Sequence, residues 1–207
     1  MRHAFVLLAA FAAAVPSAAG PGALAFQSPS PAAEKWEPLF DGKTLNGLAT
    51  RDGAANWRAE DGVLTAGPES PRGYIATTRE FDNFQLKAEF WVNEGANSGI
   101  FLRVPKIEVP IDQRTAVEVN ISDTHRTWPT GSVNEIAKVP FAPATVGKWN
   151  SYDITADGPH LLVKLNGVTT VDAQDARHVR GPIGFQYCCN SGNVVKFRNI
   201  QIRAISR

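Results

Sequence analysis

The sequence predicts an all-β protein folded as a jelly-roll sandwich of two antiparallel sheets. From Trp36 onward, apolar and polar residues alternate over short stretches, as in strands that are buried on one face. Turn-forming pairs separate these stretches: Asp41-Gly42, Asp61-Gly62, Asn166-Gly167 and Ser191-Gly192. No stretch of ten or more residues repeats its apolar residues with a helical period. Many short strands joined by regular turns are typical of two packed antiparallel sheets.

The N-terminal segment predicts export. Met1-Arg2-His3 is a short basic head, residues 4–15 form an apolar run, and small residues follow it as far as residue 25. We therefore expect a signal peptide over residues 1–25 and a periplasmic or extracellular mature protein. The apolar run is shorter than the roughly 20 residues of a spanning helix, so a membrane anchor is the weaker interpretation. Residues 26–35, rich in Pro, Ser and Ala, predict a disordered linker.

The composition allows one main folded domain, residues 36–207, and excludes some partners. The chain has 207 residues, of which 43% are hydrophobic, so this domain can bury a substantial core. Lysine and arginine total 21 against 20 acidic residues, and no basic run is long enough to neutralise a row of phosphates. We expect no nucleic-acid partner and no stable membrane span in the mature protein. The sequence does not indicate an oligomeric state.

Eight stretches of the predicted domain alternate as strands do: residues 84–92, 99–104, 115–121, 150–156, 160–167, 168–173, 183–188 and 194–203. The alternation gives each strand an apolar inner face and a more polar outer face. The outer faces of the first three strands carry side chains that suit ligand binding: Glu89, Trp91, Phe101, Arg103, Glu118 and Asn120.

If residues 84–93 and 99–104 pair as neighbouring antiparallel strands, four of these side chains share one surface: Glu89, Trp91, Phe101 and Arg103. Glu118 and Asn120 would extend that surface if their strand belongs to the same sheet. Aromatic rings cover the apolar face of a pyranose, while Arg and Glu form directional hydrogen bonds to hydroxyl groups. The alternative is a surface ion pair between Glu89 and Arg103 on a solvated face.

The connection Glu94-Gly95-Ala96-Asn97-Ser98-Gly99 also has two interpretations. Its glycines allow positive φ and its asparagine can bond to neighbouring backbone, so a tight turn explains it. Small residues at this point would equally allow a ligand to approach the backbone.

Several segments together resemble a known family. They are PLFDGKTLNGL, NWRAEDGVLTAG, GYIATTREFDNFQLKAEFWVNEGANSGIFLRV, AVEVNISD, GKWNSYDITADGPHLLVKLNGV and GPIGFQ…VVKFRNIQI, in that order. Their order and spacing resemble the secreted bacterial 3-keto-disaccharide hydrolase family, also described as 3-keto-glucoside 1,2-lyase and 3-keto-2-hydroxy-glucal hydratase domains. The resemblance implies a concanavalin A-like sandwich with a sugar site on its concave sheet. Four residues match the family's polar positions: Glu89, Asn97, Arg103 and Glu118.

The resemblance also implies a reaction. A ketone at C3 of a sugar acidifies the C2 proton, so that a base can remove it while a cation stabilises the enolate. Loss of the C1 substituent and addition of water then complete a net hydrolysis of the 3-keto-glycoside. We assign Glu118 as the base, Arg103 as the enolate or hydroxyl clamp, and Glu89 as an orienting or second acid/base group. The expected substrate-binding residues are Trp91, Asn97, Phe101, Asn120, Asp123, His125 and Gln186.

We expect no cofactor. A divalent cation held by Glu118, Asp123 and His125 is a lesser hypothesis, because oxygen and imidazole ligands suit several metals but no compact zinc-type motif is present.

The chain departs from the family at two positions. Asn134 stands where relatives often have a tyrosine, and Cys188 stands where they often have a histidine. Cys188 and Cys189 are the only cysteines. Neighbouring Cα atoms are about 3.8 Å apart, closer than in most disulfides, so we expect two unpaired thiols, with a vicinal disulfide as the alternative.

Two other functions fit the same fold. A non-catalytic carbohydrate-binding or adhesion module would use the same aromatic and polar groups, and a laminin-G-like protein-interaction domain would share only the sandwich. A buried carboxylate with a raised pKa would favour the enzyme, because a lectin can keep its acids solvated.

Overall fold

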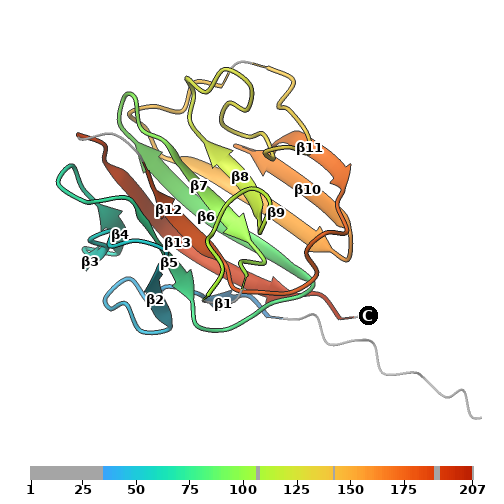
Figure 1. The fold of residues 1–207 in the computed structure, drawn as a ribbon, viewed down its shortest axis with the longest axis horizontal. Coiled ribbons are helices and arrows are strands. Elements are labelled where there is room, and N and C mark those ends of the chain that lie inside the picture. The colour runs from blue at the N-terminus through green and yellow to red at the C-terminus, as the bar shows by residue number, and fades with distance from the viewer. Residues whose placement is uncertain (1–34, 106–107, 142, 189–191, 207) are drawn as a thin grey trace, which may run out of the picture. The chain divides into compact units, whose positions relative to one another are not determined.

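The computed structural model describes residues 35–105, 108–141, 143–188 and 192–206. The predicted signal peptide and nearly all of the predicted linker lie outside this part of the chain. Within it, the protein forms thirteen strands and no helix, and all strand pairs are antiparallel (Figure 1). It therefore contains no helix long and apolar enough to cross a membrane. The predicted all-β sandwich of two antiparallel sheets is confirmed.

The larger sheet has eight strands. Seven of them follow the order β11 (Val168–Gln174), β10 (His160–Leu165), β9 (Asn150–Asp157), β6 (Phe84–Val92), β13 (Val195–Ala204), β4 (Val63–Ala66) and β3 (Arg58–Glu60). The eighth, β1 (Glu37–Pro38), pairs with β13. The smaller sheet has the order β2 (Leu48–Arg51), β5 (Gly73–Thr77), β12 (Gly184–Tyr187), β7 (Ser98–Leu102) and β8 (Val117–Ile121).

The expected pairing of residues 84–93 with 99–104 is wrong. β6 pairs with β9 and β13 in the larger sheet, whereas β7 pairs with β8 and β12 in the smaller one. The connection between them therefore passes from one sheet to the other. The apolar faces of both strands contribute to the same core from opposite sides, through Phe90 in β6 and Ile100 in β7. Alternation shows which face of a strand is buried, but not to which sheet the strand belongs.

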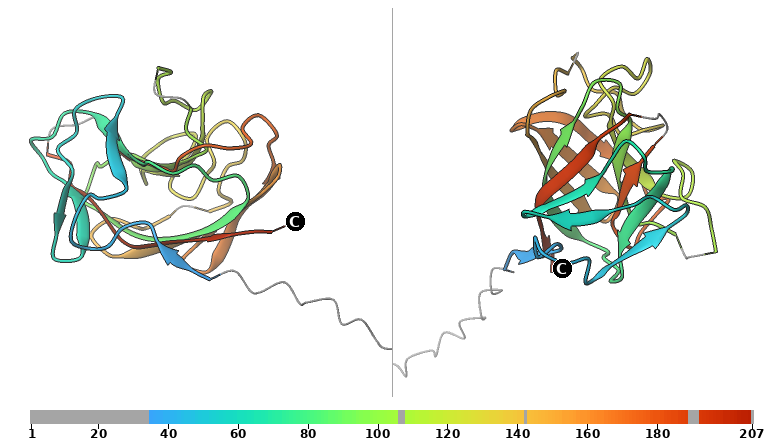
Figure 2. Two further views of the ribbon diagram at one scale, coloured as in Figure 1. Left: turned by 90° about the horizontal axis from the view of Figure 1, so that it is seen from below. Right: turned by 90° about the vertical axis from the view of Figure 1, so that its left-hand side faces the viewer.

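The space between the sheets is filled by one large cluster of buried aliphatic and aromatic side chains. A second, smaller cluster consists of Tyr74, Phe101, Val104, Ile111 and Ala116. Tyr74 donates a hydrogen bond to the carbonyl oxygen of Ile111 (3.0 Å), so the segment that contains Ile111 lies over the outer face of the smaller sheet. Figure 2 shows the long connections that rise on that side of the sandwich.

Residues 132–134 extend the smaller sheet beyond β8. The amide of Asn120 donates to the carbonyl of Ser132 (2.9 Å), and the amide of Asn134 donates to the carbonyl of Glu118 (3.0 Å). This register brings the side chain of Asn134 to the same face as that of Glu118.

Candidate functional site

The polar side chains that come together lie on the outer side of the smaller sheet, in two adjacent rows across its strands. The pairings Glu118 with Phe101 and Phe101 with Gly184 define one row, which Asn134 extends. Asn120 pairs with Gly99, and Gln186 pairs with Tyr74. The register between β7 and β12 places Gly99 beside Gln186, which completes the second row. We call this surface the Glu118 face; it consists of Asn134, Glu118, Phe101, Gly184, Asn120, Gly99, Gln186 and Tyr74.

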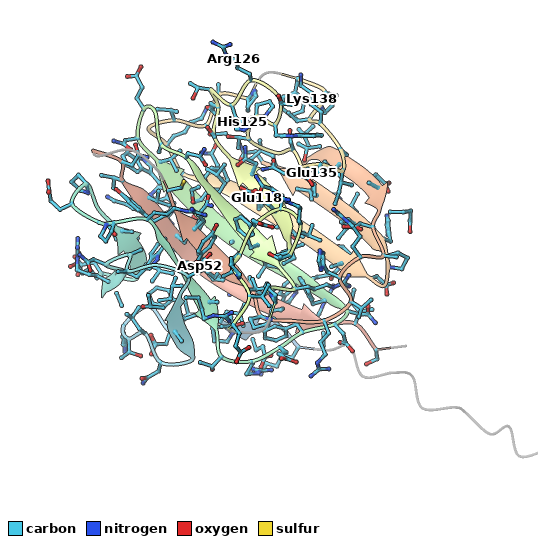
Figure 3. The ribbon with its side chains drawn as sticks, viewed as in Figure 1. Asp52, Glu118, His125, Arg126, Glu135 and Lys138 are labelled. Carbon is cyan, nitrogen blue, oxygen red and sulfur yellow. The ribbon has the colours of Figure 1, made fainter. Side chains whose placement is uncertain are left out.

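Glu118 is the only one of the three expected catalytic residues that this face contains. Its side chain is almost fully buried, with 4% of its surface exposed. Burial raises the pKa of Glu118 to about 7, because the ionised carboxylate loses its hydration. A hydrogen bond from Asn134 Nδ2 to Oε2 (2.6 Å) and the positive charge of Arg72 oppose this rise in pKa. In the view of Figure 3, Glu118 lies between Asp52 and Glu135.

Gly99 provides the space that the Glu118 carboxylate occupies. A Cβ atom at Gly99 would lie 3.0 Å from Oε1 of Glu118 and 3.3 Å from Cε2 of Phe101. Both distances are tighter than ordinary carbon contacts. The absence of a side chain therefore lets Glu118 lean across β7 toward β12.

Tyr74 organises the other end of the face. Its hydroxyl donates to Ile111 and accepts from Gln186 Nε2 (2.9 Å) and, at a longer 3.4 Å, from Arg72 Nη2. Burial raises the pKa of Tyr74, so this hydroxyl stays protonated and remains a donor. The hydrogen bond to Tyr74 raises the pKa of Arg72, whose charge also acts on Glu118.

Glu89 and Trp91 do not belong to this face, which corrects their expected roles. They lie on β6, on the outer side of the larger sheet, because β6 and β7 belong to different sheets. Glu89 accepts hydrogen bonds from Arg198 Nε (2.7 Å) and Asn199 Nδ2 (2.8 Å). Burial raises the pKa of Glu89, but these two hydrogen bonds outweigh burial and hold the pKa below its usual value. The ammonium group of Lys196 lies 5.0 Å from the centre of the Trp91 ring.

Arg103 is also absent from the Glu118 face. It follows the end of β7 with φ of 56°, so the alternation of the strand no longer sets its direction. Its guanidinium is buried and donates to the carbonyl oxygens of Asp82 (2.6 and 3.1 Å), Gly158 (2.8 Å) and His178 (2.7 Å). Arg103 therefore joins three turns. The cation whose charge acts on Glu118 is Arg72.

The expected substrate-binding residues divide into two groups. Phe101, Asn120 and Gln186 lie on the Glu118 face, where Phe101 packs edge-on against Tyr74 with ring centres 5.1 Å apart. The side chain of Asn120 donates to the carbonyl oxygen of Trp128, which anchors the loop after β8.

Asp123 and His125 shape that same loop. Asp123 accepts three hydrogen bonds of 2.6 Å, one from Thr130 and two from Thr145. His125 Nδ1 accepts from the amide of Trp128 (2.9 Å). Asn97 precedes β7, and its backbone pairs with that of Cys188 in an isolated antiparallel β-bridge.

The residues of the lesser metal hypothesis do not gather around one point. Among the described residues, no three His, Cys, Asp or Glu side chains are placed to hold a metal ion together. The oxygens of Asp123 and Nδ1 of His125 are hydrogen-bonded to the protein, as described above.

Asn134, Arg72 and Tyr74 were missed as site residues. From the sequence, Asn134 was noted only as a departure from the family. The signal for its place in the site is weak, because it depends on residues 132–134 pairing with the edge of the sheet. Tyr74 carried a weak signal, since it begins an apolar stretch after the Pro71-Arg72-Gly73 turn.

The expectation of two unpaired thiols is wrong, because Cys188 is disulfide-bonded. Cys189 lies outside the described residues. β12 ends at Tyr187, and Cys188 continues its register through a single β-bridge with Asn97, so the regular strand on which that expectation rested stops at Cys188.

Comparison with known proteins places this fold among carbohydrate-related domains. A structure from Parabacteroides distasonis described as a "putative glycosyl hydrolase" aligns with a TM-score of 0.71 at 20% identity, over 83% of this chain and 94% of that one. A second from the same organism, with the same description, aligns with a TM-score of 0.69 at 25% identity, over 83% and 100%. The carbohydrate-binding module CBM66 from Bacillus subtilis shares the fold, with a TM-score of 0.59 at 16% identity over 76% and 96%.

No curated protein matches the sequence. Residues 35–203 match the model of the 3-keto-alpha-glucoside-1,2-lyase-like domain. Because this match spans most of the chain, the protein belongs to the 3-keto-alpha-glucoside-1,2-lyase-like family of carbohydrate-active domains.

Proposed function

We propose that this domain cleaves 3-keto-glycosides by elimination, with Glu118 as the general base. The observation that carries the proposal is the buried carboxyl group whose pKa is raised to about 7. A base with a pKa near the working pH combines a useful ionised fraction with a strong tendency to take a proton. A simple sugar-binding surface has no need to bury an acid in this way.

The proposed reaction uses the ketone at C3 of the sugar. Glu118 takes the proton from C2, and the electron pair of the C–H bond forms an enolate with the C3 carbonyl. The enolate then collapses to a double bond between C1 and C2, while the C1–O bond breaks and the aglycone leaves with a proton from solvent. Addition of water to the resulting 3-keto-glycal completes a net hydrolysis.

Arg72 takes the electrostatic role that the sequence analysis gave to Arg103. Its positive charge already acts on Glu118, and the same charge would stabilise an enolate formed beside that carboxylate. The donors of Arg103 are all directed to backbone carbonyls, so it supports the fold.

We also propose that the protein works after export. The predicted signal peptide over residues 1–25 motivates this, and the disulfide-bonded Cys188 supports it, since disulfides persist in oxidising compartments. Mass spectrometry of the protein recovered from the producing cell would give the mature N-terminus. An intact Met1 in a cytoplasmic fraction would contradict the proposal.

The test of function is an assay of the mature domain with a chromogenic 3-keto-glucoside. We expect release of the aglycone with a 3-keto-glycal as the first product, with or without a chelator. Glu118→Gln should lower kcat by at least about a hundredfold, the usual contribution of a general base. Glu94→Gln, which changes an exposed acid in the connection between the sheets, is the control and should remain active.

A non-catalytic carbohydrate-binding module is the second candidate, because the buried polar groups of the Glu118 face could bind sugar hydroxyls without chemistry. Binding of a 3-keto-glucoside with no aglycone release would favour this candidate. Equal turnover by wild type and Glu118→Gln would remove Glu118 from the mechanism.

A further inference from the structure

Two buried carbonyl oxygens on the Glu118 face have no hydrogen-bond partner. They are Oδ1 of Asn134 and Oε1 of Gln186, and the side chains that carry them are only 4% and 6% exposed. A buried polar atom without a partner destabilises a protein by about 1 to 3 kcal/mol. Two such atoms on the same face therefore point to a ligand that supplies the missing donors.

The orientation of the Gln186 amide follows from its neighbours. Tyr74 has one hydroxyl proton, which it donates to the carbonyl of Ile111. The hydroxyl can then only accept from Gln186, so the amide NH2 group faces Tyr74 at 2.9 Å. The carbonyl oxygen of Gln186 is consequently the end that is left for a ligand.

The orientation of the Asn134 amide follows from Glu118. An ionised carboxylate only accepts hydrogen bonds, so Nδ2 of Asn134 faces Oε2 of Glu118 at 2.6 Å. The carbonyl oxygen of Asn134 points away from that carboxylate. Its backbone is held as well, through the amide bond to the carbonyl of Glu118.

The two acceptors lie on opposite sides of the Glu118 carboxylate. Asn134 belongs to the segment beside β8, whereas Gln186 lies on β12, beyond Gly99. Glu118 Oε1 lies above Gly99, where a Cβ atom would contact it at 3.0 Å. A ring that presents a C–H group to Glu118 would therefore reach one acceptor on each side.

We propose that Asn134 and Gln186 each accept a hydrogen bond from a substrate hydroxyl, and that these hydroxyls flank the ketone of a 3-keto-glucoside. The proposal rests on the proposed function. Ketone and ether oxygens donate no proton, so only hydroxyl groups can satisfy these acceptors. Asn134 lies next to Glu118 and takes the hydroxyl on C2, the carbon that loses its proton. Gln186 takes the hydroxyl on C4.

The test compares a 3-keto-glucoside with its 4-deoxy analogue. For the wild type, we expect kcat/KM to be about ten- to hundredfold lower with the analogue, because Gln186 Oε1 is then left without a donor. Gln186→Leu should lower kcat/KM for the parent by a similar factor and remove the difference between the two substrates. Gln201→Leu, on the larger sheet, is the control and should keep the wild-type ratio.

Asn134→Leu should in the same way remove the discrimination against a 2-deoxy analogue while keeping the discrimination at C4. The readout is the ratio of the kcat/KM values for the parent and the deoxy substrate, because this substitution also changes the pKa of Glu118 and so affects both values. If the leucine variants do not fold, the wild-type ratios alone decide. Equal kcat/KM for parent and 4-deoxy substrate would overturn the assignment of Gln186.

A binding measurement separates this inference from the proposed function. Methyl α-glucoside and its 4-deoxy analogue contain no ketone, so their binding does not depend on the elimination reaction. Weaker binding of the analogue to wild type, with no difference in Gln186→Leu, supports the hydroxyl site even if no 3-keto-glucoside is cleaved. Equal binding of both compounds, or binding of neither, overturns it.

Discussion

Replacing Gly99 by alanine tests whether the position of the Glu118 carboxylate determines activity. The new methyl group would lie 3.0 Å from Oε1 and 3.2 Å from Cγ of Glu118, so this side chain must move by a few tenths of an ångström. Gly99 lies within β7 and is absent from the residues with positive φ, so alanine is compatible with its backbone.

The expected effect on stability is small. Alanine in place of glycine in a strand gains about 0.5 to 1 kcal/mol from reduced chain entropy, which the crowding against Glu118 offsets. The melting temperature should therefore change by only a few degrees. The activity should change more, because a displacement of up to about 1 Å in a catalytic group can lower the rate by about a hundredfold.

The assay is kcat/KM for aglycone release from a 3-keto-glucoside as a function of pH. We expect a loss of about ten- to hundredfold and a higher apparent pKa, since the methyl group removes more water from the carboxylate. Gly67→Ala is the control, because its Cβ would meet only Arg58 at an ordinary 3.7 Å. Full activity with an unchanged pH profile in Gly99→Ala would refute the reasoning.

Three further predictions concern the acids and the buried arginine. Because burial raises the pKa of Glu118 to about 7 from its ordinary 4.5, folding favours the protonated carboxyl group. The free energy of unfolding should therefore fall by about 3 kcal/mol as the pH rises from about 4.5 through 7. In urea titrations, Glu118→Gln should flatten this pH dependence. Arg103→Met should lower the free energy of unfolding by about 3 to 5 kcal/mol, because three buried carbonyls lose their donor. Arg79→Met, which breaks an exposed ion pair, should lower it by less than about 1 kcal/mol, and similar losses in both variants would contradict the role of Arg103. Glu89→Gln should keep kcat/KM within about twofold of wild type, since Glu89 lies on the other sheet; a loss as large as that of Glu118→Gln would contradict this site.

The fold class could be predicted because it depends on local patterns. Alternation with a period of two and the turn-forming pairs act over a few residues, and both are visible in the sequence. The pairing of strands could not be predicted in this way. β6 is followed directly by β7 in the chain, yet its neighbours are β9 and β13, which lie about 60 to 110 residues further on.

The site could be predicted only in part, because alternation shows which residues share a face of a strand but not which strands are neighbours. Glu118, Phe101 and Asn120 follow the alternation of two strands that are neighbours, so their common face could be inferred. Arg103 breaks the alternation through its positive φ. This conformation could not be predicted, because no glycine stands next to Arg103 in the sequence. Asn134 reaches Glu118 only because residues 132–134 add to the edge of the sheet, and this depends on the long loop after β8.

The single guanidinium of Arg103 links the carbonyl groups of Asp82, Gly158 and His178, which are far apart along the chain. Opening any one of these turns breaks its own bond to the guanidinium and exposes the shared donor group to water, which couples the three turns. We therefore infer that this corner of the sandwich exchanges its amide hydrogens as one cooperative unit. An insertion engineered into any one of the three turns would loosen the other two.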